Sequence, residues 1–105
     1  MRQVKGNIFN GDSYKAIFAR AIYKRLMSRE WVTLAEIMSD YHFGKPCENP
    51  SKEEHYGELK KAFGEIKKLV TEKVGKDSIE VEGNNRNQRF RYKGNIDDPL
   101  SDLYN

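Results

Sequence analysis

The clearest β signal in the chain lies at residues 79–92, which read IEVEGNNRNQRFRY. Apolar and charged residues alternate over 79–82 and again over 89–92, and the residues between these runs tolerate turn conformations. The alternation predicts a β-hairpin whose buried face carries four residues: Ile79, Val81, Phe90 and Tyr92. The other face brings opposite charges together, so we expect cross-strand pairing of Glu80 and Glu82 with Arg89 and Arg91.

Helical periodicity precedes the hairpin in three places. Apolar residues recur every three or four positions over about 14–27, about 34–40 and from about 51 to Gly75. Asp12 or Ser13 is expected to cap the first helix, and Thr33 to cap the second, with Glu36 at capping-box spacing. The pattern therefore predicts three helices followed by a hairpin, and we expect no internal repeat and no low-complexity tract.

The third helix is the longest of these elements. Residues 49–51, Asn-Pro-Ser, open it, and Gly75 is a natural end because glycine accepts a positive φ freely. Gly57 and Gly64 lie inside the helix, and each costs about 1 kcal/mol relative to alanine. We expect them to mark either the close approach of another helix or a break near Gly57.

A short extended pair, Trp31 and Val32, separates the first two helices. The order helix, short strand, helix, loop, helix, hairpin resembles that of the winged helix-turn-helix fold, in which the short strand pairs with the hairpin edge. The resemblance implies an α+β domain with three helices, a small antiparallel sheet and a C-terminal hairpin called the wing. We expect this domain to span 12–94. A lead-in at 1–11 precedes it, and we expect Ile8 or Phe9 of this lead-in to pack onto the domain. An acidic linker or tail at 95–105 follows.

Composition narrows the functional classes. A chain of 105 residues forms one modest core with no room for a deep catalytic cleft, so we expect no enzyme. The single cysteine, Cys47, fits a reducing cytoplasm, and we expect neither a secretory leader nor a membrane span. Residues 1–94 hold 19 basic and 13 acidic side chains, a formal charge of +6 that suits a polyanionic partner.

The C-terminal residues carry a closer resemblance. Residues 89–94, Arg-Phe-Arg-Tyr-Lys-Gly, followed by Asp98-Pro99-Leu100, are similar to the exit from the wing into the linker of WYL-domain transcriptional regulators. In that family an N-terminal winged helix precedes a WYL sensor domain. The resemblance implies the DNA-binding module of a regulator whose C-terminal sensor domain is absent from this chain, either a truncated piece or a stand-alone module. No WYL tripeptide occurs, so no effector and no cofactor is inferred.

The winged-helix resemblance assigns roles to the elements. The major groove of B-DNA is about 12 Å wide and admits one α-helix, so the third helix is the expected reader. Its candidate DNA-facing residues are Ser51, Lys52, His55, Glu58, Lys60 and Lys61. Only the Glu58 carboxylate among them cannot donate a hydrogen bond to DNA. The wing would lie on the backbone or in the minor groove through Asn85, Arg86, Asn87 and Arg89. Lys15 and Arg20 of the first helix could add phosphate contacts.

Each of these features also has a purely structural explanation. Five acids accompany the lysines of the third helix, as in an ordinary solvated helix: Glu53, Glu54, Glu58, Glu65 and Glu72. His42, Cys47 and His55 match no zinc spacing and lack a fourth ligand, so no metal site is predicted. The alternative to double-stranded DNA binding is a winged helix used for protein–protein interaction or dimerisation. In the DNA-binding case a homodimer on two half-sites is expected.

Overall fold

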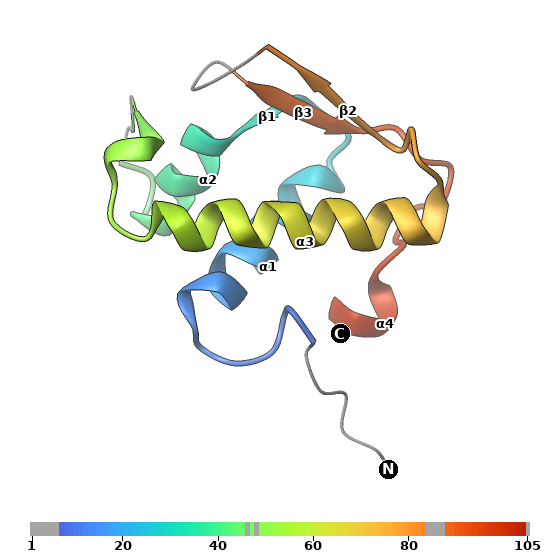
Figure 1. The fold of residues 1–105 in the computed structure, drawn as a ribbon, viewed down its shortest axis with the longest axis horizontal. Coiled ribbons are helices and arrows are strands. Elements are labelled where there is room, and N and C mark those ends of the chain that lie inside the picture. Colours follow the sequence, from blue (N-terminus) through green and yellow to red (C-terminus); the bar gives the residue numbers. More distant parts are fainter. Residues whose placement is uncertain (1–6, 46, 48, 84–87, 105) are drawn as a thin grey trace.

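The chain forms an α+β structure in which helices pack against one face of a small antiparallel sheet (Figure 1). The computed structural model describes residues 7–45, 47, 49–83 and 88–104. Within these residues the elements are, in chain order, α1 (Tyr14–Leu26), β1 (Val32–Thr33), α2 (Leu34–Tyr41), the 3₁₀ turn η1 (Pro50–Lys52), α3 (Tyr56–Val74), β2 (Ile79–Glu82), β3 (Arg89–Tyr92) and α4 (Ser101–Tyr104).

The hairpin and the short strand before α2 form one sheet with the order β1-β3-β2. Central β3 pairs antiparallel with both neighbours, so that Phe90 lies opposite Val32 of β1 and Val81 of β2. The predicted hairpin face is confirmed, because Ile79, Phe90 and Tyr92 are buried and Val81 packs against the core. The expected pairing of the short strand with the hairpin is confirmed as well.

Local sequence determines where α1 and α2 begin. The Ser13 hydroxyl accepts a hydrogen bond from the Ala16 N–H at 3.1 Å and satisfies one of the free donors of the first turn. Thr33 and Glu36 form the predicted capping box, with reciprocal bonds of 3.1 Å and 2.8 Å. Both helices bury apolar residues that recur at helical spacing: Phe18, Ile22 and Leu26 in α1, and Leu34, Ile37 and Met38 in α2. Tyr41, which continues the pattern in α2, is half-buried.

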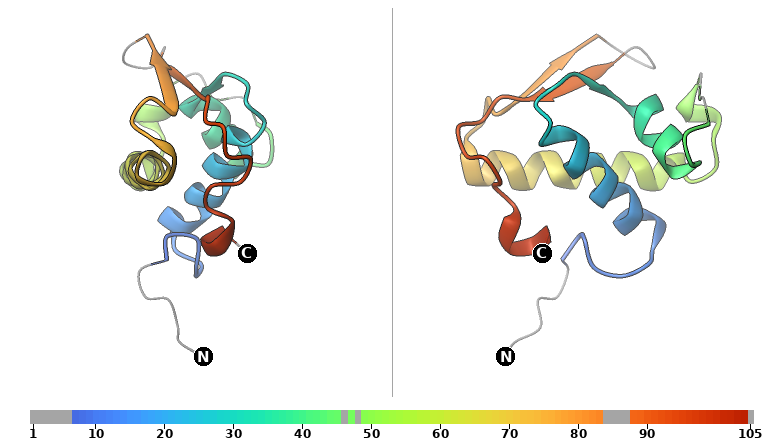
Figure 2. Two further views of the ribbon diagram at one scale, coloured as in Figure 1. Left: turned by 90° about the vertical axis from the view of Figure 1, so that its right-hand side faces the viewer. Right: turned by 180° about the vertical axis from the view of Figure 1, so that it is seen from behind.

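The long helix α3 lies at one edge of the molecule, beside α1 and below the sheet (Figure 2). Its fully buried residues are Leu59, Ala62, Ile66 and Val70. On the sheet side, Phe63 packs on Phe90 of β3 with ring centroids 4.2 Å apart. Because α1 and the sheet contact α3 from two directions, the face that α3 presents outward is fixed.

The start of α3 corrects the sequence-based expectation. The α-helix begins at Tyr56, and residues 50–52 form the separate turn η1 instead of its first turn. Between them His55 has a positive φ of 66°, which a continuous right-handed helix cannot contain. The His55 ring stacks on Tyr14 of α1 with centroids 3.5 Å apart, so a tertiary contact accompanies this break. The predicted end at Gly75 is confirmed, with a φ of 137°.

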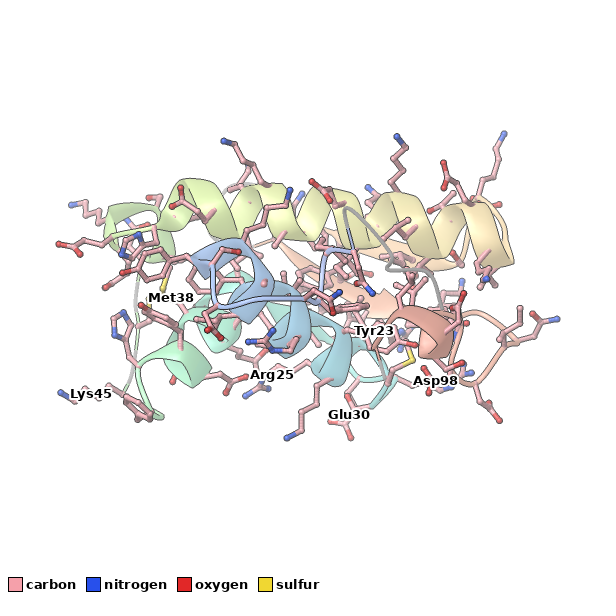
Figure 3. All side chains as sticks on the ribbon, turned by 90° about the horizontal axis from the view of Figure 1, so that it is seen from below. Tyr23, Arg25, Glu30, Met38, Lys45 and Asp98 are labelled. Atoms are coloured by element: carbon pink, nitrogen blue, oxygen red, sulfur yellow. The ribbon has the colours of Figure 1, made fainter. Side chains whose placement is uncertain are left out.

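Both terminal segments pack onto the body. Ile8 and Phe9 are 6% and 4% exposed, which confirms the expected return of the lead-in. Leu100 is 2% exposed, and its N–H donates to the Tyr23 hydroxyl at 2.9 Å. That hydroxyl donates in turn to the Asp98 carboxylate (Figure 3), and burial raises the pKa of Tyr23.

The expectation of three helices is wrong, because α4 follows Leu100. The buried Leu100 side chain anchors residues that were expected to be linker or tail, and they close a short helical turn on the body. The Asn7 side-chain amide donates to the Leu103 carbonyl at 3.0 Å, so the two terminal segments meet.

We predict that Leu100→Ala destabilises the fold by about 2–5 kcal/mol, the cost of removing a fully buried leucine side chain. The matched control is Ile96→Ala in the same segment. The Ile96 residue is 42% exposed, so this substitution should change the free energy of unfolding by less than about 0.5 kcal/mol. Urea denaturation followed by circular dichroism measures both. Equal, small effects would mean that residues 95–104 are not part of the cooperative unit.

Candidate nucleic-acid interface

The outward face of α3 is basic. Lys60, Lys61, Lys67 and Lys68 are all exposed, and we call these four residues the lysine face. None of them forms an ion pair with any residue that the structure describes. In Figure 3, side chains of α3 that end in nitrogen extend away from the rest of the molecule. The lysine face is therefore a set of positive charges available to an anionic partner.

A seven-residue repeat generates this face. Residues 57–63 read GELKKAF and residues 64–70 read GEIKKLV, so the expectation of no internal repeat is wrong. Seven residues are close to two helical turns, and equivalent positions of the two copies therefore lie on nearly the same side of α3. The candidates Lys60 and Lys61 belong to the first copy. Lys67 and Lys68 of the second copy were not predicted as site residues, although the repeat identifies them.

The two glycines of the repeat are exposed on the same side as the lysines. A Cβ atom added at Gly57 or Gly64 would meet no atom within 4 Å, so no neighbouring helix approaches either position. The expectation of a close helix approach is wrong, and the break lies at residues 53–55, near the alternative site at Gly57. Each glycine costs α3 about 1 kcal/mol relative to alanine, and no contact among the described residues explains that cost.

Two of the three acids within α3 interact with residues outside the lysine face. Glu65 forms an ion pair with Lys15 of α1. A carboxylate oxygen of Glu58 lies 3.6 Å from the Nδ1 atom of His55. By the 100° spacing of helical residues, these acids border the row of Lys61 and Lys68. Glu72, four residues after Lys68, is exposed. The candidate phosphate contacts Lys15 and Arg20 are also engaged, since Arg20 donates to the carbonyls of Phe9 and Gly11.

The structure divides the predicted N-terminal readers of α3 into two groups. Ser51 and Lys52 lie on η1 and are exposed, and the Ser51 hydroxyl donates to the Asn49 side chain at 2.6 Å. His55 instead lies in a cluster of rings with Tyr14 and Tyr41. Burial raises the pKa of the Tyr41 hydroxyl in this cluster. The predicted position of these residues in the first turn of α3 is thus corrected, and the stacked His55 is the least available of the three.

On the hairpin, Asn85, Arg86 and Asn87 lie outside the described residues. Arg89 is described and has partners on its own sheet. Its guanidinium donates to Glu82 at 2.6 Å and lies 4.3 Å from the centre of the Trp31 ring. The predicted cross-strand pairing of arginines and glutamates is confirmed, so a contact from Arg89 to DNA would compete with two existing interactions.

Arg91 repeats this arrangement one pair along the ladder. Its guanidinium donates to Glu80 at 2.7 Å and lies 4.4 Å from the Trp31 ring centre, so the two arginines share one indole. The hydrogen bond from Arg91 holds the pKa of the Glu80 carboxyl below its ordinary value of 4.5. The outer face of the sheet is therefore a charge-compensated surface, in contrast to the lysine face.

This pKa shift predicts a pH-dependent stability. The unfolded chain has the higher Glu80 pKa, so the pair stabilises the fold above pH about 4.5 and the stabilisation is lost as the pH falls through the lower, folded value. Glu80→Gln should lower the urea midpoint at pH 7, and its difference from the wild type should shrink below pH 4.5. In an Arg91→Gln background the Glu80→Gln effect should be much smaller. An effect at pH 7 that is the same in both backgrounds would contradict this coupling.

In the part of the chain that the structure describes, no group of three or more His, Cys, Asp or Glu side chains is placed to hold a metal ion. No helix among the described residues has both the length and the apolar character needed to cross a membrane. Comparison with protein-family models, with curated proteins and with solved structures gives no match for this chain.

Proposed function

We propose that this chain is a winged-helix domain that binds double-stranded DNA through the lysine face of α3, as the DNA-binding module of a transcriptional regulator. The observation that carries the proposal is the exposure of four lysines on one side of the longest helix, without ion pairs to described residues. Lysine ammonium groups are well suited to phosphate oxygens, and phosphate contacts supply essentially all of the non-specific affinity of a protein for duplex DNA.

The topology supports the winged-helix part of the proposal. The element order α1-β1-α2-α3-β2-β3 and the sheet order β1-β3-β2 agree with a wing that follows the reading helix and is completed by the strand between the first two helices. The end of β2 and the start of β3 are directed toward the end of the molecule where α2 and the start of α3 lie (Figure 1). The assignment to a transcriptional regulator rests on the resemblance of residues 89–100 to WYL-domain regulators.

A second candidate, a protein-interaction module, is favoured by one observation. Phe43, which follows α2, is 98% exposed and has a positive φ of 60°. An exposed aromatic side chain on a backbone conformation that is unfavourable for it is a feature of contact surfaces. The lysine face outweighs it here because it comprises four charges and is generated by a sequence repeat, whereas Phe43 is a single side chain.

We predict that the wild-type chain binds mixed-sequence duplex DNA in fluorescence anisotropy titrations. Its affinity should fall steeply between about 50 and about 200 mM salt. Replacing Lys60, Lys61, Lys67 and Lys68 together by glutamine should reduce the slope of log K against log salt by about 3–4, since each lost phosphate contact contributes about 0.9. Glutamine preserves helix propensity, so the variant should remain folded.

The control variant carries Lys24→Gln and Lys45→Gln. Lys24 is exposed on α1 nine residues after Lys15, hence about half a turn round the helix from the side that contacts α3. Lys45 lies on the side of the molecule away from α3 (Figure 3). The control should bind nearly as the wild type does. Absence of wild-type binding at the lower salt, in a folded sample, would reject the DNA-binding proposal and favour the interaction module through Phe43.

A further inference from the structure

The lysine face has an internal geometry that bears on how α3 would meet DNA. Successive residues of an α-helix are about 100° apart, so Gly57 and Gly64 lie on nearly one line along the helix axis. Lys60 and Lys67 lie about 60° to one side of this line, and Lys61 and Lys68 about 40° to the other. The buried stripe lies on the opposite side of the helix. The exposed face therefore carries a central glycine line between two rows of lysines, with about 10 Å between successive lysines in each row. The exposed Glu72 borders this face, about 40° beyond Lys68.

The composition of α3 is unusual for a helix that reads bases. Paired hydrogen bonds to base edges come mainly from arginine on guanine and from asparagine or glutamine on adenine. α3 contains no arginine, asparagine or glutamine at any position. Lysine can also contact guanine, but the four lysines flank the line that would face the groove floor, where the glycines offer no side chain at all.

The two rows suit the walls of the groove. The major groove is about 12 Å wide, close to the diameter of a helix with its side chains, so rows on both flanks of α3 point at the two phosphate backbones. Glycines on the central line let the helix backbone come closer to the groove floor than any other residue would. This arrangement gives a role to two helix-weakening glycines at which an added Cβ atom would meet no described atom within 4 Å.

From this geometry we infer that α3 enters the major groove as a sequence-tolerant phosphate clamp: its two lysine rows hold the opposite backbones, and its glycine line makes no base-specific contact. The inference rests on the proposed DNA binding and specifies its chemistry. Any preference of the chain for one base sequence over another then arises outside α3.

The test compares three duplexes of equal length, one rich in A·T, one rich in G·C and one mixed, in anisotropy titrations at about 100 mM salt. Lys60→Gln with Lys67→Gln removes one row, and Lys61→Gln with Lys68→Gln removes the other. Each row variant should lose about tenfold or more in affinity on every duplex by the same factor, and each should lower the salt slope by about 2. Lys24→Gln with Lys45→Gln is the control of equal charge and should leave the affinities nearly unchanged.

A second variant tests the glycine line. Gly64→Leu places a good helix former where the free protein has open space, so the urea midpoint should not fall. If the line faces the groove floor, the same variant should bind all three duplexes at least several-fold more weakly. A stable variant that binds as the wild type does would show that the glycine line does not approach DNA.

The outcomes separate the two proposals. If the wild-type chain binds none of the duplexes, both the proposed DNA binding and the clamp are rejected. Wild-type binding together with a row variant that changes the ranking of the three duplexes, or that binds as the wild type does, rejects the clamp and leaves DNA binding standing. Uniform loss in both row variants and in Gly64→Leu supports the clamp.

Discussion

Helix α3 packs against α1 and the sheet at the same time, and this double contact holds the core together. Leu59, Ala62, Ile66 and Val70 close the core, and Phe63 joins the helix to the central strand through Phe90. A helix held on one side only could rotate and present different residues to solvent. With α1 and the sheet both in contact, the burial of one stripe determines that the opposite stripe, with its lysines, faces outward.

The fold gives two of the acids in α3 partners outside the lysine face. Along the chain, the acids and lysines of α3 alternate in a way that is typical of a solvated helix without a partner. In three dimensions Glu65 is paired with Lys15 and Glu58 lies beside His55, whereas the lysine face has no such partners among the described residues. On the sheet, by contrast, Arg89 and Arg91 form ion pairs with glutamates. Helix α3 thus presents four exposed lysines without ion pairs to described residues.

Sequence patterns predicted the parts of the fold that local physics decides. The capping box at Thr33, the hairpin register and the end of α3 at Gly75 each depend on residues close together in the chain or on a period of two. The start of α3 could not be predicted in this way, because the break at His55 accompanies a stack on Tyr14, 41 residues earlier in the chain. α4 was missed for a similar reason, since Leu100 is ordered by the distant Tyr23. Of the predicted interface residues, Lys60 and Lys61 lie on the exposed face, and the repeat that adds Lys67 and Lys68 was visible in the sequence.

The position of Trp31 has an optical consequence. It is the only tryptophan of the chain, and its indole lies against the guanidinium groups of Arg89 and Arg91 at the seam between β1 and the hairpin. That seam joins residues almost 60 positions apart, the kind of contact that forms late because a long loop must close first. The fluorescence of Trp31, excited selectively, should therefore report the closure of the sheet in refolding experiments. It does so separately from the formation of the helices and without an added label.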